Sequence, residues 1–387
     1  MYRIRTFDKI SEKGLAIFDK AIYGVSPDEK NPDAIILRSH VLEADEIGGG
    51  VMCIARAGAG YNNIPVDLCS GKGIVVFNTP GANANAVKEL VLCSLFLSAR
   101  DVVGGILFAI SLKDSDDPAG AIEKGKSRFM GPELKEKNLG VIGLGAIGVM
   151  VANAALELGM SVYGYDPYLS VESAWDLSGK VKKASSPEEV YKHCDYITFH
   201  IPLVESTKEI IGRESIGKMK EGVRILNFSR GGLADESALL GALDSGKVER
   251  YVTDFPGKAL LGHPKAVCIP HLGASTSESE ENCATMAASQ IREYMENGNV
   301  VNSVNFPKCI MEPTSPGRLT VAHRNVPNML GQILALLEKQ NIKVEDMLNK
   351  GKGDYAYTIV NTCSEIGEDV LESVNAIDGV LRARTIK

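Results

Sequence analysis

The sequence predicts an α/β protein of several domains, in which parallel sheets covered by helices are followed by a smaller strand-rich module. Three observations predict this. Short apolar runs alternate with helical segments through the first 270 residues, three prolines interrupt the chain between residues 307 and 317, and a different order of elements follows. A chain of 387 residues also exceeds one ordinary domain, and its 44% hydrophobic and 24% charged residues are typical of globular proteins.

The predicted strands are short and apolar, as expected for parallel strands buried on both faces. In the first hundred residues they cover 34–38, 53–56 and 74–77, and a long apolar helix begins near residue 83. Further strands cover residues 139–142, 161–165, 196–199, 224–227, 251–254 and 267–269. A helix that begins soon after His271 ends at Gly298, a candidate C-cap. Strands separated by helices indicate βαβ units.

Residues 304–316 are predicted to be a linker, and the order of elements changes after it. The pieces are strand, helix, strand, strand, helix and strand, at residues 318–323, 329–340, 342–351, 355–362, 368–377 and 380–387. This order is the ferredoxin-like βαββαβ arrangement. Such a sheet has exposed edges, and pairing them between subunits favours a homodimer or homotetramer.

Composition excludes several classes of partner. The net charge is −7 without a dense basic cluster, which argues against nucleic acid and against a membrane surface. No apolar run follows the basic residues near the N-terminus, and none is long enough to span a bilayer. The eight cysteines are dispersed without a CxxC pair, so we expect a reduced cytoplasmic protein with no bound metal.

The segment LGVIGLGAIG contains the glycine pattern of a dinucleotide site, at Gly143, Gly145 and Gly148. It follows a predicted strand and opens a helix, and the next strand ends at Asp166, as this pattern requires. Backbone amides at the helix start would bind the pyrophosphate, and Asp166 would accept hydrogen bonds from the ribose hydroxyls. A carboxylate there repels a 2′-phosphate, so the predicted cofactor is NAD. The alternative is a generic α/β turn with a surface aspartate.

Arg230 and His271 each follow an apolar strand, at the edge where parallel sheets bind ligands. Oxidation of a 2-hydroxy acid needs a cation for the carboxylate, for which a guanidinium is well shaped, and a base for the hydroxyl proton, such as histidine. Taken singly, an arginine or a histidine in such a position is more often structural. His200, at the end of another strand, is a second candidate for the base.

The motifs GLGAIG, YGYDP, HIPL, NFSRGGLADESAL and PHLGAST resemble the D-2-hydroxyacid dehydrogenase family, as do RAGAGYNNI (56–64) and NTPGANANAVKEL (78–90). The resemblance implies a flavodoxin-like substrate domain, residues 1–93 and 271–303, with an inserted Rossmann NAD domain at 94–270. It also implies that residues 317–387 form an ACT-like regulatory domain.

The resemblance further implies roles for individual residues: Arg230 binds the carboxylate and His271 is the acid/base. The implied cofactor-binding residues are Gly143, Gly145, Ala146, Ile147, Gly148, Asp166, His200, Ile201, Pro202, Phe228, Ser229, Arg230, Asp254, His271 and Gly273. The implied substrate-binding residues are Arg56, Ala57, Gly58, Asn83 and Arg230.

One departure from the family concerns the partner of His271. The family usually has a glutamate shortly after the strand that ends at Asp254, and this carboxylate orients the histidine and raises its pKa. Here the corresponding segment is TDFPGKALLGHP, and no acidic residue lies between Asp254 and His271. Either another carboxylate serves, or His271 works without one.

The segment HRNVPNML resembles the ligand loop of ACT domains at His323, Asn325 and Pro327, which implies L-serine as an effector. It departs from that loop at Asn328, where glycine is usual, and Lys343 stands where asparagine is usual. The alternative is that this module only pairs subunits.

The motif PHLGAST and the C-terminal extension are most similar to those of family members that oxidise 3-phosphoglycerate to 3-phosphohydroxypyruvate, the first step of L-serine synthesis. Arg56 is then the candidate cation for the phosphate. Two alternatives remain: a more general 2-oxo acid reductase, acting for example on 2-oxoglutarate, and a catalytically weak NAD-sensing regulator.

Overall fold

The computed structural model describes residues 1–386 and contains three sheets. Internal contacts divide the chain into two units: residues 1–83 together with the chain from Ser277 onward, and residues Ala84–Thr276. Lys387, the last residue of the predicted C-terminal domain, lies outside the described residues. Each unit is described by itself below.

The first unit contains a five-stranded parallel sheet in the order β2-β1-β3-β4-β5, the flavodoxin-like order. Its elements are β1 (Tyr2–Thr6), α1 (Glu12–Leu15), β2 (Tyr23–Ser26), β3 (Ala34–Leu37), β4 (Cys53–Arg56), α2 (Val66–Gly71), β5 (Val75–Phe77) and α11 (Ser277–Asn297). Helix α11 lies against β3 and β4 through a face of small apolar residues that includes Ala284, Ala287, Ala288 and Ile291. Apolar side chains therefore cover both faces of this sheet.

The predicted strands β3, β4 and β5 are confirmed, whereas β1 and β2 were not predicted. Strand β1 reads YRIRT, and its arginines conceal a single buried apolar position, Ile4. It is nevertheless central, because it pairs with both β2 and β3.

The second unit contains a seven-stranded parallel sheet in the order β12-β11-β10-β9-β6-β7-β8, which includes the Rossmann order. Its elements are α3 (Ala84–Ala99), α4 (Val102–Ser111), α5 (Pro118–Gly125), β6 (Asn138–Ile142), α6 (Ala146–Glu157), β7 (Ser161–Tyr165), α7 (Val171–Asp176), β8 (Lys182–Lys183), α8 (Pro187–His193), β9 (Tyr196–Phe199), α9 (Arg213–Lys218), β10 (Val223–Asn227), α10 (Glu236–Ser245), β11 (Val248–Thr253) and β12 (Ala266–Cys268). The six strands predicted for this region are confirmed, and the two-residue strand β8 was not predicted.

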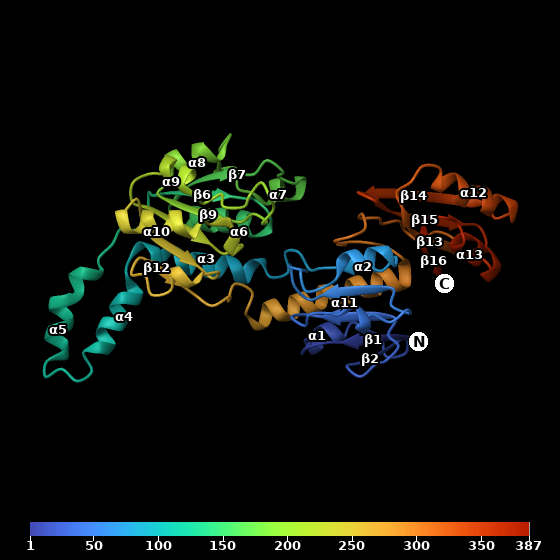
Figure 1. The fold of residues 1–387 in the computed structure, drawn as a ribbon, viewed down its shortest axis with the longest axis horizontal. Coiled ribbons are helices and arrows are strands. Elements are labelled where there is room, and N and C mark those ends of the chain that lie inside the picture. Colours follow the sequence, from blue (N-terminus) through green and yellow to red (C-terminus); the bar gives the residue numbers. More distant parts are fainter. Residues whose placement is uncertain (387) are drawn as a thin grey trace. The chain divides into compact units, whose positions relative to one another are not determined.

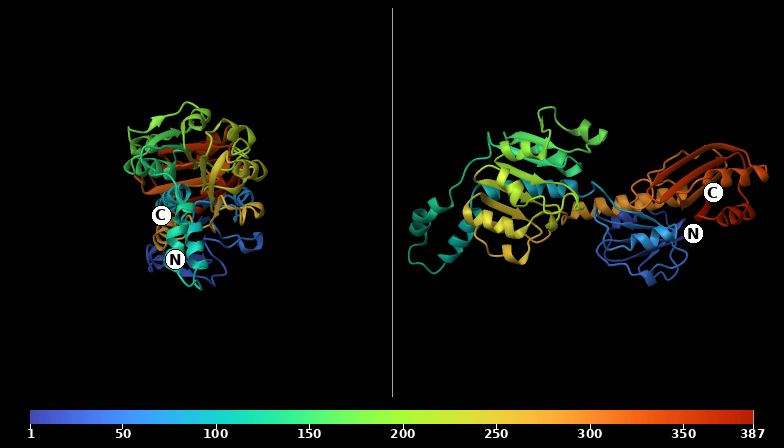
Figure 2. Two further views of the ribbon diagram at one scale, coloured as in Figure 1. Left: turned by 90° about the vertical axis from the view of Figure 1, so that its left-hand side faces the viewer. Right: turned by 45° about the horizontal axis from the view of Figure 1, so that its top comes forward.

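The predicted domain boundary after residue 93 falls inside α3, all of which belongs to the second unit. The physical reason is packing, because Val87, Val91 and Leu95 of α3 share a core with α6. The segment that follows, for which no element was predicted, forms helices α4 and α5, which extend away from the sheet of this unit (Figures 1 and 2).

The C-terminal part of the first unit is an antiparallel sheet in the order β14-β15-β13-β16. Its elements are β13 (Gly317–Arg324), α12 (Met329–Lys339), β14 (Val344–Lys352), β15 (Tyr355–Thr362), α13 (Glu368–Asn375) and β16 (Val380–Ile386). The βαββαβ order confirms the predicted ferredoxin-like fold. Helices α12 and α13 share an apolar core with one face of this sheet.

The other face of the antiparallel sheet packs on the end of α11 (Figure 1). The Arg384 guanidinium lies 3.9 Å from the centre of the Tyr294 ring and donates a hydrogen bond to the Tyr294 carbonyl. The Tyr357 hydroxyl donates to the carbonyl of Gly298 at 2.8 Å. Side chains of the C-terminal sheet thus donate hydrogen bonds to carbonyl groups at the end of α11, where the Tyr294 carbonyl also accepts from the Gly298 amide at 3.0 Å.

No single helix within residues 1–386 is long and apolar enough to cross a membrane. Helices α3 and α4 meet that criterion only as a pair, which is bent by 68° between them. One face of α3 is buried in the core of the second unit, so this helix has a structural role there.

Candidate active site

The glycine loop connects β6 to α6 at the carboxyl end of the seven-stranded sheet. A Cβ at Gly148 would overlap the carbonyl oxygen of Gly143, and one at Gly143 would overlap that of His200. A Cβ at Gly145 would have no heavy atom within 4 Å. The inner side of the loop is therefore closely packed, whereas its outer side is open at Gly145. This is the arrangement needed for a ligand to approach the backbone.

The surroundings of this loop fit a dinucleotide. Ala146 and Ile147 are the first residues of α6, where amide groups lack intrahelical partners and favour an anion. Asp166 follows β7 and accepts hydrogen bonds from the amides of Leu144, at 2.8 Å, and Tyr168, at 2.7 Å. These bonds hold the carboxylate beside the glycine loop and leave lone pairs for ribose hydroxyls.

His200, Ile201 and Pro202 follow β9, next to the same loop. The His200 Nε2 atom lies 3.0 Å from the Thr198 hydroxyl, and its Nδ1 atom is buried without a partner in residues 1–386. Burial lowers the pKa of His200 to about 4, so the ring is neutral at neutral pH. A histidine with such a low pKa is a poor general base at neutral pH, which weighs against His200 as the acid/base.

Phe228, Ser229 and Arg230 follow β10 on the other side of β9. The Ser229 hydroxyl donates to the Phe199 carbonyl at 2.6 Å, and the Asn227 side-chain amide donates to the Arg230 carbonyl at 2.9 Å. These bonds fix the backbone of the turn. The Arg230 side chain is exposed, and its guanidinium donates to the Ser229 carbonyl at 2.7 Å. It presents donors that a carboxylate can use.

His271 is exposed on the loop after β12, and Asp254 follows the neighbouring strand β11. The Phe255 and His271 rings are 4.4 Å apart between centres. The buried Asp254 carboxylate accepts a hydrogen bond from the Gly273 amide at 3.3 Å. Burial raises the pKa of Asp254, whereas the positive charges of His271 and Arg230 lower it. The structure thus brings Arg230, Asp254 and His271 together at one edge of the sheet.

A carboxylate from another element lies against the segment where the family glutamate is missing. A Cβ at Gly257 would overlap the carboxylate oxygen of Glu236, which comes from the first turn of α10. No pattern in the sequence connects these two residues, which are separated by a strand and a helix. The only sign in the sequence is the glycine itself, because Gly257 has no side chain and so leaves room for a neighbouring group.

The predicted substrate residues Arg56, Ala57, Gly58 and Asn83 belong to the first unit, at and beyond the carboxyl end of β4. A Cβ at Gly58 would overlap the Arg56 guanidinium, so the arginine folds back across this glycine. The Arg56 Nε atom also donates to the Arg38 carbonyl at 3.0 Å.

Sequence analysis missed Arg38 as a candidate cation. It follows the buried strand β3, beside β4, and its guanidinium is 2.7 Å from the Glu280 carboxylate. Its place directly after an apolar strand is the signal that could have found it, the same signal that singled out Arg230.

The two predicted effector residues lie in different surroundings. His323 is 2% exposed, with Nδ1 2.7 Å from the Arg324 carbonyl and Nε2 2.9 Å from the Thr358 hydroxyl. Asn325 is exposed, and its side-chain amide donates to the Gly353 carbonyl at 3.1 Å. His323 therefore supports the loop internally, whereas Asn325 is accessible to a ligand.

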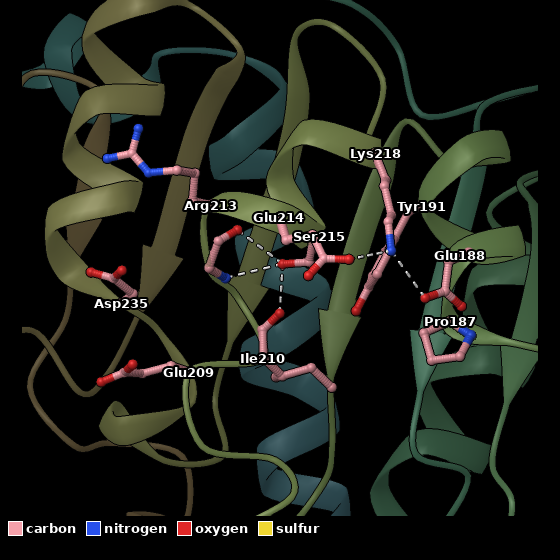
Figure 3. A pocket seen from close by; sticks show the side chains of 11 residues that line it. Pro187, Glu188, Tyr191, Glu209, Ile210, Arg213, Glu214, Ser215, Lys218 and Asp235 are labelled. Carbon is pink, nitrogen blue, oxygen red and sulfur yellow. Dashed lines mark hydrogen bonds and ion pairs between the residues drawn. The ribbon is translucent and has the colours of Figure 1, made fainter.

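A polar pocket of about 490 Å³ lies between α8, α9 and the start of α10 (Figure 3). Lys218 lies between the carboxylates of Glu214, at 2.8 Å, and Glu188, at 3.4 Å. Ser215 donates to the Ile210 carbonyl at 2.6 Å. None of the predicted site residues lines this pocket, and the polar groups just named are paired with one another, so it carries no argument for the active site.

Within residues 1–386, no group of three or more histidine, cysteine, aspartate or glutamate side chains is arranged to hold a metal ion. All eight cysteines are free thiols.

Comparison with known proteins identifies the family. Residues 111–273 match the NAD binding domain of the D-isomer specific 2-hydroxyacid dehydrogenases. The chain is 33% identical to D-3-phosphoglycerate dehydrogenase of Methanocaldococcus jannaschii over 377 residues, covering 91% of this chain and 68% of that protein. It is 30% identical to the Haemophilus influenzae enzyme of the same name, covering 90% and 84%. Across eight such relatives the chain spans from 49% to 84% of the relative's own length.

A solved structure supports the same family. NAD⁺-bound 3-phosphoglycerate dehydrogenase of Entamoeba histolytica superposes with a TM-score of 0.63 at 30% identity, covering 79% of this chain and 98% of that one. The relatives span most of this chain, and the glycine loop, Arg230 and His271 are present. The chain therefore belongs to the D-isomer specific 2-hydroxyacid dehydrogenase family.

Proposed function

We propose that this protein oxidises 3-phosphoglycerate at C2 with NAD, forming 3-phosphohydroxypyruvate, the step that opens L-serine synthesis. The similarity to D-3-phosphoglycerate dehydrogenases over nine-tenths of the chain carries this proposal. The position of Arg230 and His271 at the same edge of the sheet as the glycine loop supports the reaction type. We place this activity in the cytoplasm, because the dispersed cysteines suit a reducing compartment.

The residues of the second unit divide the work of the reaction. Arg230 binds the substrate carboxylate with two parallel hydrogen bonds and so fixes C2. His271 takes the proton of the C2 hydroxyl and returns it in the reverse direction. The glycine loop and Asp166 hold NAD, which when bound supplies the hydride acceptor. Asp254, Phe228 and Ser229 line the nicotinamide side.

The first unit supplies cations suited to the distal phosphate. Arg56 is the last residue of β4, and Arg38 directly follows the adjacent strand β3, at the same edge of the five-stranded sheet. A guanidinium matches phosphate oxygens in shape and charge, whereas a purely carboxylate substrate would need less positive charge there. These arginines favour a phosphorylated substrate over 2-oxoglutarate. Ala57, Gly58 and Asn83 are proposed as the neighbouring substrate contacts.

Absorbance of NADH tests the assignment, with purified protein, NAD and 3-phosphoglycerate at mildly alkaline pH. We expect turnover in the wild type, loss of at least a hundredfold in His271→Ala, and near-normal turnover in the control His193→Gln, whose side chain is exposed and outside the predicted site. Consumption of NADH with 2-oxoglutarate, and none of NAD with 3-phosphoglycerate, would instead support the general reductase. NAD binding without turnover of either substrate would support the NAD-sensing regulator.

We further propose that the protein is a homo-oligomer. Helix α4 has no buried residue in its unit, and Ile106, Leu107 and Ile110 are between 54% and 64% exposed. An exposed apolar surface of this kind is typical of protein–protein contacts. Light scattering on the wild type and on Leu107→Glu tests this, and a monomeric wild type would contradict it.

The C-terminal domain is proposed to be an ACT-like domain that binds L-serine at the loop of Asn325. The exposed loop and its amide side chain support this, with His323 as an internal support: burial lowers the pKa of His323, which keeps the ring neutral. Calorimetric titration with L-serine should give binding that Asn325→Ala weakens. No heat of binding in the wild type would limit this domain to a role in assembly.

A further inference from the structure

Asp254 is a buried carboxylate with an oxygen atom that lacks a partner. Its residue is 3% exposed, and its Oδ2 atom accepts from the Gly273 amide, whereas Oδ1 has no hydrogen-bond partner in residues 1–386. Buried polar atoms are nearly always paired, so such an atom calls for an explanation. A carboxylate held this way is fixed in position and still has lone pairs available.

Residues 253–255 contact the loop of His271 at positions before, at and after the histidine. Before it, the Ile269 amide donates to the Thr253 carbonyl at 2.9 Å. After it, the Gly273 amide donates to Asp254, and a Cβ at Gly273 would lie 3.2 Å from that carboxylate. At the histidine itself, the Phe255 ring packs on the imidazole. Three consecutive residues of one segment therefore contact the loop.

The charged groups that face Asp254 are both positive. Arg230 comes from the turn after β10 and His271 from the loop after β12, and each lowers the pKa that burial raises. The third element at this corner, α3, contributes apolar Val87, whose methyl group would be 3.5 Å from a Cβ at Gly273. The attraction between Asp254 and His271 is therefore weakly screened by water on the buried side.

An acid/base histidine works best when a carboxylate fixes its ring and stabilises its charged form. We propose that Asp254 is the positioning carboxylate of His271: it anchors the histidine loop and stabilises the imidazolium that forms when His271 takes the hydroxyl proton. The proton moves from the substrate oxygen to the imidazole, the hydride leaves C2 for NAD, and Asp254 stays ionised. This inference rests on the proposed function and deepens it.

Glu236 is the other carboxylate that could be considered as the partner of His271, and it provides a matched control for Asp254. Its carboxylate lies against Gly257, and its charge acts on Cys268 and Tyr251, whose pKa values it helps to raise. Glu236 is not among the charges that shift the pKa of Asp254. Removing its charge should therefore leave His271 unchanged.

The test is an NMR titration of the His271 ring, assigned with His271→Ala, in the full-length wild type, Asp254→Asn and Glu236→Gln. Asparagine keeps an acceptor for the Gly273 amide but removes the charge. We expect the His271 midpoint to move to lower pH by about one unit in Asp254→Asn, since one unit is a tenfold change in proton affinity. We expect no shift in Glu236→Gln. The acid limb of kcat/KM for oxidation should move down in pH with the midpoint, and kcat should fall about tenfold.

An unchanged His271 midpoint in Asp254→Asn, or an equal shift in Glu236→Gln, would overturn the proposal. If Asp254→Asn fails to fold, Gly273→Ala replaces it, because the added methyl displaces the carboxylate without removing it. A smaller shift in the same direction is then expected, and none would overturn the proposal. The titration needs no substrate, so a wild type without turnover would refute the proposed function while the midpoints still decide the role of Asp254.

Discussion

Gly298 joins the end of α11 to the C-terminal sheet, and replacing it by alanine tests that contact. Its backbone has a φ of 70°, a left-handed conformation that favours glycine. A Cβ there would overlap the Cγ2 atom of Thr320 on β13 and lie 3.2 Å from Ile386 on β16. Thr320 is buried and branched, so it cannot turn away.

The expected loss of stability has two parts. A left-handed backbone costs an L-residue about 1–2 kcal/mol. Inserting a methyl group into a packed core costs about 1–3 kcal/mol more. Alanine also lowers the conformational entropy of the unfolded chain, which offsets about 0.4–1 kcal/mol of this loss. Gly298→Ala should therefore destabilise the first unit by about 2–4 kcal/mol, and at its size each kcal/mol lowers Tm by about 2–4 °C.

Gly353 provides a matched control in the same unit. Its φ is 58°, but a Cβ there would have no heavy atom within 4 Å. Gly353→Ala should therefore cost only the backbone part, about 1 kcal/mol. Scanning calorimetry of the two variants and the wild type measures the difference. Equal losses in the two variants would refute the conclusion that the C-terminal sheet packs directly on the end of α11.

Three further predictions concern the second unit. Gly148→Ala should abolish NAD binding because its methyl group displaces the Gly143 carbonyl. Gly145→Ala should fold normally by circular dichroism, but calorimetric titration should show strongly weakened NAD binding, because its methyl group would stand where the pyrophosphate approaches the backbone. Asp166→Ala should weaken the binding of NAD. It should also lower the ratio of the NADP to the NAD dissociation constant, because the carboxylate that repels a 2′-phosphate is gone. His200 has a pKa of about 4 when folded and about 6.5 when unfolded, so the unfolded state binds the extra proton between these values. The second unit should then lose up to about 3 kcal/mol as pH falls from 6.5 to 4, and His200→Gln should remove that loss in urea unfolding at pH 7 and 4.5.

Much of the fold follows from local patterns in the sequence. Strands such as β3 and β9 are continuous apolar runs, which only a doubly covered parallel sheet can bury. The glycine loop and Asp166 are recognisable because a phosphate site needs particular residues at fixed spacing along one βαβ unit. The exceptions are instructive: β1 was missed because arginines surround Ile4, and α4 because none of its apolar residues is buried in its own unit.

The sequence by itself determined the α/β class, the cofactor loop, the ferredoxin-like order of the C-terminal elements and the identity of Arg230 and His271 as candidates. Only the tertiary structure decided which groups surround them: Asp254 beside the His271 loop, Glu236 against Gly257, and the C-terminal sheet on the end of α11. The physical reason is that backbone periodicity and turn chemistry act over a few residues, and they leave a trace in the sequence. Contacts between distant segments depend on how whole elements pack, and a residue such as Asp254 shows its role only when the strand beside it brings His271 near.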